Sequence, residues 1–187
     1  MIAVNKNKCV GCGLCIELCP RSVITLKNDI ADIDNDNCVG CQMCVRQCPQ
    51  QALRHLSGVS IMVAFGTEDG KKITPDHFGS SRFFSVYKFT ENGYEFIEQR
   101  QKVRYEEDES ITDGDPGKAK AAAKTLAGID CVVARIIGPN IARIRKKFVC
   151  AIIRKETVQE AIAVVQANLC TILEEKEKQD RIGIVLS

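Results

Sequence analysis

The feature that most constrains this chain is a run of cysteines that occurs twice near its N-terminus. Residues 9–12, Cys-Val-Gly-Cys, recur 29 positions later as residues 38–41, and the cysteines and proline that follow recur with them. Each copy reads C-x2-C-x2-C-x3-C-P. Three thiolates spaced in this way can reach three corners of one iron–sulfur cube, and the intervening glycines let backbone amides approach the sulfurs. The repeat therefore predicts iron–sulfur clusters in this part of the chain.

Over residues 1–57 the sequence resembles the bacterial ferredoxins that hold two 4Fe–4S clusters. In that family the fourth cysteine of each run binds the cluster of the other run. The resemblance therefore implies a two-cluster ferredoxin domain with crossed ligation. Cluster I is then bound by Cys9, Cys12, Cys15 and Cys48, and cluster II by Cys38, Cys41, Cys44 and Cys19.

The residues around the cysteines support further expectations. Apolar side chains among them, Val10 and Val39 included, are expected to keep water from the clusters. Between the two copies, residues 23–33 are expected to form a small hairpin that turns at Asn28 and Asp29.

Two other interpretations of the cysteines remain open. Paired C-x2-C motifs also bind zinc, but a zinc site takes four ligands and needs neither the third cysteine step nor the trailing Cys-Pro. Alternatively, the clusters only stabilise a small core and exchange no electrons.

Charge and composition argue against several partners. A net charge of +2 gives no global electrostatic reason to expect nucleic acid or a membrane. No apolar run is long enough to span a bilayer, and no signal peptide follows Met1. Eight of the eleven cysteines lie in the first 48 residues, which indicates metal binding in a reducing compartment rather than disulfides. We therefore expect a cytoplasmic protein.

A change in composition near residues 56–58 predicts a second domain over residues 58–187. We expect strands at residues 59–65, 83–90, 94–103, 131–134 and 149–153, with a hairpin turn at 91–93 and a closing strand or tail at 182–186. We expect helices at residues 118–126 and 139–147, an acidic loop at 106–117, and one long helix from a Thr157–Glu160 capping box through Leu173. Because a β-hairpin comes first and helices then alternate with strands, we expect a mixed α/β sheet.

The remaining cysteines, Cys131, Cys150 and Cys170, lie in apolar runs of this second domain. Because free cysteine behaves as a small hydrophobic residue, we expect all three to pack in the core.

Three short motifs in the second domain carry a further resemblance: Gly66-Thr67-Glu68-Asp69-Gly70, Asp76-His77-Phe78-Gly79 and Ile137-Gly138-Pro139-Asn140. Over roughly residues 59–165 the chain resembles the dinitrogenase iron–molybdenum cofactor biosynthesis family of nitrogenase accessory proteins. The resemblance implies a ribonuclease H-like fold, in which helices flank a five-stranded mixed sheet. Together with the ferredoxin domain, this fold places the whole chain in the α+β / α/β class. It also implies binding of a metallocluster rather than catalysis, with His77 as the candidate cofactor ligand.

Both domains therefore indicate iron–sulfur chemistry. The leading hypothesis is a non-enzymatic accessory protein whose C-terminal domain carries a further iron–sulfur or molybdenum-containing cluster, or its precursor, and whose partner is a redox or metallocofactor-assembly protein. The alternative is an electron-transfer ferredoxin whose C-terminal domain docks a redox enzyme. A third hypothesis is a sensor in which the state of the clusters changes the interface between the domains.

Overall fold

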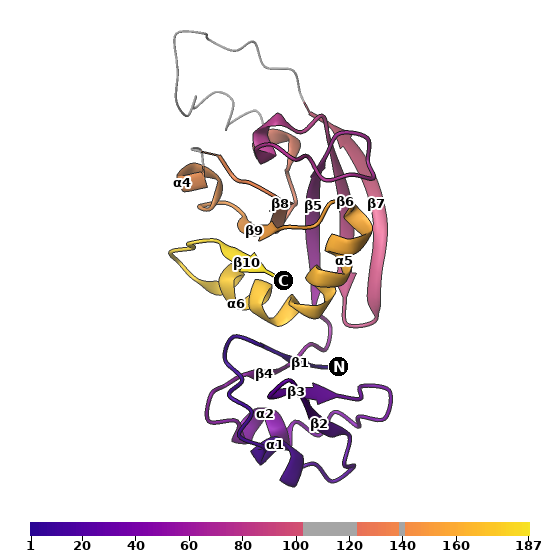
Figure 1. The fold of residues 1–187 in the computed structure, drawn as a ribbon, viewed down its shortest axis with the longest axis vertical. Coiled ribbons are helices and arrows are strands. Elements are labelled where there is room, and N and C mark those ends of the chain that lie inside the picture. The colour runs from indigo at the N-terminus through magenta and orange to yellow at the C-terminus, as the bar shows by residue number, and fades with distance from the viewer. Residues whose placement is uncertain (103–122, 139–140) are drawn as a thin grey trace. The chain divides into compact units, whose positions relative to one another are not determined.

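The computed structural model describes residues 1–102, 123–138 and 141–187 (Figure 1). The described chain divides into two compact units, the first formed mainly by residues 1–59 and the second mainly by the residues that follow. The expected acidic loop lies outside the described residues, as do Pro139 and Asn140. The domain boundary that we place after residue 57 stays a prediction. Within the described ranges, no helix is both long enough and apolar enough to cross a membrane.

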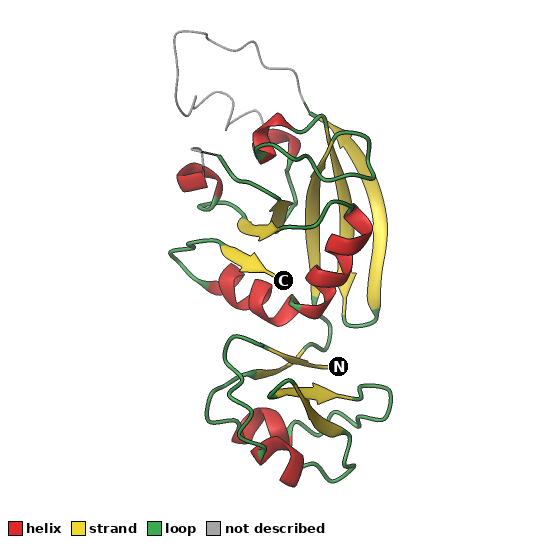
Figure 2. Cartoon of the chain, in the orientation of Figure 1, coloured by secondary structure: helices red, strands yellow, loops and turns green. Residues whose placement is uncertain are grey.

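The first unit contains two short helices and two small antiparallel sheets, one pairing β1 with β4 and the other pairing β2 with β3 (Figure 2). Asn28 and Asp29 both have positive φ angles, 52° and 57°, which close the predicted hairpin tightly. The elements are β1 (Ile2–Val4), α1 (Leu14–Glu17), β2 (Ile24–Lys27), β3 (Ile30–Ile33), α2 (Met43–Gln47) and β4 (Leu53–His55).

The sequence repeat reappears in the core of this unit. Ile2 and Ala31 are equivalent positions in the two copies, and so are Ile24 and Leu53; all four are buried together. Five of the repeat cysteines pack partly buried around them, and a sixth, Cys44, is buried. Val10 and Val39 line the pockets that contain the repeat cysteines, and each is 63% exposed, so the expectation that they keep water from the clusters stays a prediction.

A six-stranded sheet forms the centre of the second unit, in the order β10-β9-β8-β5-β6-β7. Strands β10, β9, β8 and β5 run parallel to one another, whereas β6 and β7 form a hairpin at the other edge. The sheet therefore has one strand more than the resemblance implies, because the last residues form a strand rather than a tail. The strands are β5 (Ser60–Thr67), β6 (Phe83–Thr90), β7 (Gly93–Gln101), β8 (Cys131–Ala134), β9 (Val149–Ile153) and β10 (Ile184–Leu186).

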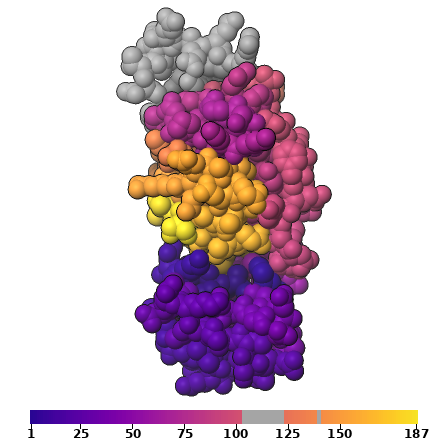
Figure 3. All heavy atoms as spheres, turned by 45° about the vertical axis from the view of Figure 1, so that its right-hand side comes forward, coloured from indigo at the N-terminus to yellow at the C-terminus, as the bar shows by residue number. Residues whose placement is uncertain are grey.

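The two faces of this sheet are covered by different segments. On one face a buried cluster includes Phe84, Val132 and Cys150, and Ile141 and Ile144 of α4 (Ile141–Ile144) pack against it. Helix α5 (Val158–Ala167) buries its own apolar stripe and donates a hydrogen bond from Gln159 Nε2 to the Tyr94 hydroxyl of β7 (3.1 Å). The other residues of β7 are largely exposed and form the pink surface in Figure 3.

The helices differ from the sequence-based expectations in length. Thr157 and Glu160 form the predicted capping box, in which each residue's amide donates to the other's side chain (3.1 and 3.2 Å). The prediction of one long helix is wrong, because α5 ends at Ala167 and α6 (Leu169–Glu177) follows Asn168. Asparagine disfavours a helix interior because its side chain competes for backbone hydrogen bonds. The apolar spacing continues across the break, so periodicity alone does not reveal it.

Two other expected helices are only partly described. The helix expected at 139–147 is the four-residue α4, and residues 145–147 form a turn that leads into β9. Within the helix expected at 118–126, residues 123–125 are helical and residues 118–122 are not described.

A buried carboxylate holds the turn between α6 and β10. The Glu175 side chain is 1% exposed and accepts hydrogen bonds from Lys178 Nζ (2.7 Å) and from the amides of Ile182 (2.8 Å) and Gly183 (3.0 Å). Burial raises the pKa of this carboxyl, but the three donors lower it more, and the net shift is downward from 4.5. Ionised Glu175 therefore stabilises the C-terminal strand.

Replacing Glu175 with glutamine is expected to destabilise the second unit by about 2 kcal/mol at pH 7, because three hydrogen bonds lose their charged acceptor. The pKa of Glu175 is lower in the folded state, so its contribution is present above 4.5 and is lost as pH falls through the folded value. Urea unfolding of the metal-free chain can be followed by tyrosine fluorescence, since all three tyrosines lie beyond residue 60. The exposed Asp180→Asn change in the same turn is the control. Equal loss in both variants would contradict the assignment.

Candidate metal centres

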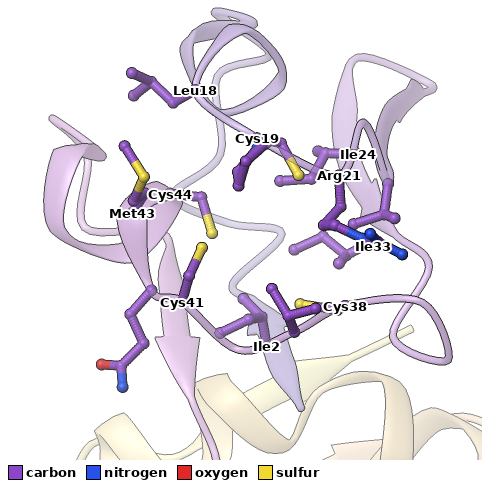
Figure 4. A pocket seen from close by; sticks show the side chains of 14 residues that line it. Ile2, Leu18, Cys19, Arg21, Ile24, Ile33, Cys38, Cys41, Met43 and Cys44 are labelled. Carbon is purple, nitrogen blue, oxygen red and sulfur yellow. The ribbon is translucent and has the colours of Figure 1, made fainter.

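Cysteines from both runs meet in one pocket of the first unit, which we call site II (Figure 4). Cys19, the last cysteine of the first run, lies there with Cys38, Cys41 and Cys44 of the second run. In Figure 4 the sulfurs of Cys41 and Cys44 point toward one another, and all four labelled cysteines border a common space. The pocket comprises about 360 Å³, part of it open to solvent, and the rest of its wall is mainly apolar.

The equivalent pocket, site I, holds the other four repeat cysteines. Cys48, the last cysteine of the second run, lies with Cys9, Cys12 and Cys15 of the first run around about 370 Å³. The walls of the two sites are made by equivalent residues of the repeat: Ala31, Leu53 and Gln50 at site I, and Ile2, Ile24 and Arg21 at site II. The fold thus places the fourth cysteine of each run beside the first three cysteines of the other run.

The chemistry of both pockets fits a cubane cluster. Each presents four thiols, the number and type of ligand that a 4Fe–4S cluster takes. Burial raises the pKa of the Cys15 and Cys44 thiols; a backbone amide lowers it, neighbouring cysteines raise it further, and the net shift is upward. Gathering four thiolates is therefore unfavourable without the positive charge of bound metal. Among the described residues, no three His, Cys, Asp or Glu side chains converge tightly enough to hold a single ion.

Two backbone amides also donate directly to sulfurs of site I. The Ala31 amide donates to Cys9 Sγ (3.4 Å) and the Ala52 amide to Cys48 Sγ (3.3 Å). Hydrogen bonds to cluster thiolates are one of the means by which a protein sets the reduction potential. Sequence reasoning did not identify these donors, because neither alanine carries a functional side chain.

In the second unit, His77 lies beside the loop after β8. His77 and Ile136 form a parallel bridge, and the amide of Phe78 donates to the Ile136 carbonyl (2.9 Å). Phe78 is buried against Phe84, with ring centroids 5.1 Å apart, and anchors the short helix η1 (Phe78–Ser80). A Cβ at Gly138 would lie 2.7 Å from His77 Cδ2, so the histidine ring packs directly on that glycine. Gly66 of the first motif packs on the Phe78 ring, since a Cβ there would lie 3.0 Å from Phe78 Cδ2, so the fold brings residues of all three motifs together.

Asp76 orients the histidine ring. Its Oδ1 accepts a hydrogen bond from the His77 amide (2.7 Å) and lies 2.8 Å from His77 Nδ1. The His77 amide, and then the ring, lower the pKa of the Asp76 carboxyl. When Nδ1 donates to this carboxylate, Nε2 keeps its lone pair, which is the usual arrangement of a metal-binding histidine. The side chain of His77 is 49% exposed, so a ligand in solvent can approach it.

The three cysteines beyond residue 59 line neither pocket. Cys131, Cys150 and Cys170 are all buried, as expected. Burial raises the pKa of the Cys131 thiol well above its usual value and that of Cys150 to about 11. These two thiols are therefore unreactive near neutral pH.

The geometry thus defines a protein with two pockets of four cysteines in one unit and, in the other, a mixed α/β sheet with an oriented surface histidine. Residues 59–168 match the family model described as "Dinitrogenase iron-molybdenum cofactor", and the chain belongs to this family. Residues 8–52 match the model described as "4Fe-4S dicluster domain". Both resemblances inferred from the motifs are confirmed.

Comparison with solved structures identifies a crystal structure from Methanocaldococcus jannaschii described as a "putative dinitrogenase". It is 16% identical, with a TM-score of 0.41, and the match covers 58% of this chain and 89% of that one. No curated protein shows a significant match to the chain.

Proposed function

We propose that the protein is a non-catalytic accessory protein of metallocofactor assembly. Its first unit holds two 4Fe–4S clusters, cluster I in site I and cluster II in site II, and exchanges electrons. Its second unit has a ribonuclease H-like fold and binds a metallocluster or a precursor through His77. The partner is a redox or cofactor-assembly protein.

The observation that carries this proposal is the sorting of eight cysteines into two pockets of four. The crossed arrangement of Cys19 and Cys48 was expected only from the family resemblance, and the pockets agree with it. When bound, each cluster would supply one-electron redox chemistry. The cysteines hold it, and the apolar walls limit its contact with water.

The second unit supports a binding role rather than catalysis. His77 is held by Asp76 and by the backbone of the β8 loop, which limits the entropy lost on binding a ligand. A single exposed imidazole suits attachment of a preformed cluster, which brings its other ligands with it. The first unit would then transfer electrons, and the second unit would carry a metallocluster.

Anaerobic iron and sulfide analysis of the full chain tests the first part. After reconstitution with iron and sulfide, we expect about eight irons in the two sites and a further amount at the second unit. Colourless protein, or zinc as the bound metal, would contradict the proposal.

His77→Ala is expected to remove only the iron in excess of eight, because the imidazole is the proposed attachment point. Gly138→Ala should reduce that excess as well, since the added Cβ displaces the His77 ring. Gly79→Ala is the matched control, because a Cβ there meets nothing within 4 Å. Excess iron that is unchanged in His77→Ala would rule out this histidine, and the first unit should keep its visible absorption in all three variants.

A second candidate function, electron delivery to a docked redox enzyme, has its own support. Cys12 and Cys41 occupy equivalent positions in the repeat, and both are exposed, so each site has one corner at the surface. Fast reduction of a partner oxidoreductase by the loaded protein, with no iron in excess of eight, would favour this function over cofactor carriage.

A further inference from the structure

The sequence repeat allows site I and site II to be compared residue by residue. At site I, amides of two residues donate to cysteine sulfurs: Ala31 to Cys9 and Ala52 to Cys48. The equivalent residues at site II, 29 positions away, are Ile2 and Val23. If the two sites were electronically alike, these amides would donate to Cys38 and Cys19.

The Ile2 amide donates elsewhere. Its acceptor is Asn35 Oδ1 (2.7 Å), and Asn35 Nδ2 donates back to the Ile2 carbonyl (3.1 Å), so one side chain satisfies both backbone groups. In the first copy, position 35 corresponds to Lys6, whose side chain has donors but no acceptor. The side chain of Lys6 therefore does not compete with Cys9 Sγ as an acceptor for the Ala31 amide. Within the described residues, the Val23 amide makes no hydrogen bond to Cys19.

The other features that could affect the reduction potentials are either the same at both sites or would favour reduction of site II. Cys15 and Cys44, which are equivalent, each have one further backbone amide nearby. The turns before Val23 and Ala52 are alike, with Ser22 and Gln51 at φ 53° and 49°. Of the residues that line the two pockets, Arg21 at site II is the one charged side chain, and its counterpart at site I is the neutral Gln50. Arg21 is exposed, so water and salt screen its effect.

We propose that site I has the higher reduction potential, and that Asn35 causes the difference by withdrawing an amide donor from site II. Reduction adds one negative charge to a cluster, and N–H donors at contact distance stabilise that charge. This inference rests on the proposed function, in that both sites must hold 4Fe–4S clusters. One electron from an external low-potential reductant then resides mainly at site I, with no proton or other reactant involved.

The test is the distribution of the first electron in the full-length, fully loaded protein, reduced to half with dithionite. Hyperfine-shifted NMR signals of the cysteine Hβ protons report the state of each site, and contacts with the methyl groups of Ala31 and Ala52 identify those of site I. We expect at least a tenfold preference for site I, equivalent to 59 mV for a one-electron couple. Equal occupancy, or a preference for site II, overturns the inference.

Asn35→Ala leaves the Ile2 amide with Cys38 as an acceptor in the same pocket and should reduce the preference at least threefold. Asn37→Ala is the matched control, because its side chain binds Asp34 rather than Ile2. An unchanged ratio in Asn35→Ala means that Asn35 is not the cause. Should Asn35→Ala fail to fold, the wild-type distribution still decides which site is preferred.

Varying the salt concentration distinguishes an effect of hydrogen bonds from an effect of surface charge on the preference for site I. Because Arg21 favours site II and is screened at high ionic strength, the preference for site I should hold or grow in 1 M salt. A preference that disappears in salt would assign the difference to exposed charges instead. Failure of the proposed function is distinguishable, since a protein with fewer than about eight irons does not reach the loaded state that this test requires.

Discussion

The double variant Cys9→Ala/Cys48→Ala is expected to keep about four irons, whereas Cys38→Ala/Cys48→Ala is expected to keep none. Cys9 and Cys48 line the same pocket, so the first pair damages one site only. Cys38 lines the other pocket, so the second pair removes a ligand from each site. If each run instead bound its own cluster, the two results would be exchanged. Iron analysis of anaerobically purified protein is the measurement.

Removing one thiol from a site leaves three charged ligands and an open coordination position, and the iron there is lost readily. The mirror variant Cys19→Ala/Cys38→Ala should also keep about four irons, because both cysteines line site II. Cys170→Ala is the control, since this buried cysteine belongs to neither pocket. Loss of iron in the control would show that the count reflects general misfolding.

Gly11→Ala is expected to be far more damaging than Gly40→Ala, although the two glycines are equivalent in the repeat. Both have φ +67°, where an alanine costs about 1–2 kcal/mol. At Gly11 the new Cβ would also lie 2.5 Å from the carbonyl oxygen of Asp29, a backbone atom fixed by the hairpin turn. At Gly40 the nearest atom is His55 Nε2, at 3.6 Å, which is ordinary contact.

The added clash at Gly11 should cost about 1–3 kcal/mol beyond the backbone strain. We expect Gly11→Ala to lose iron during purification, or to release it several times faster than Gly40→Ala when a chelator is added. Gly13→Ala is a further control, because it has φ +78° and no atom within 4 Å of the new Cβ. Equal release rates in all three variants would mean that strain alone, and not the approach of Asp29, governs the effect.

Much of the structure of the first unit could be predicted from the amino-acid sequence. The ligand types and their spacing are local properties of the chain, and so is the Asn28-Asp29 turn, because residues that tolerate positive φ determine it. The Thr157–Glu160 capping box is similarly local and is present as expected. Five strands of the second unit lie close to the predicted segments, since runs of β-branched and aromatic residues indicate strands directly, whereas β10 lies in a segment that was left open as a strand or a tail.

Other features depended on contacts between distant segments. The break at Asn168 falls within a continuous apolar stripe, so helical periodicity does not reveal it. An aspartate directly before a histidine is only a weak sequence signal. The role of Asp76 in orienting His77 becomes clear from the 2.8 Å distance between Asp76 Oδ1 and His77 Nδ1. The packing of that histidine on Gly138 joins positions 61 residues apart, which no local pattern encodes.

The amino-acid sequence by itself indicated the kind of cofactor that the first unit binds, because eight cysteines in two matching runs are typical of iron–sulfur proteins. It also identified the second unit, through short motifs near His77 and Gly138. Only the tertiary structure decided that the two matching sites are unlike. Their difference lies in where the backbone amides of Ala31 and Ile2 donate, and hydrogen bonds of that kind depend on three-dimensional approach rather than on residue type.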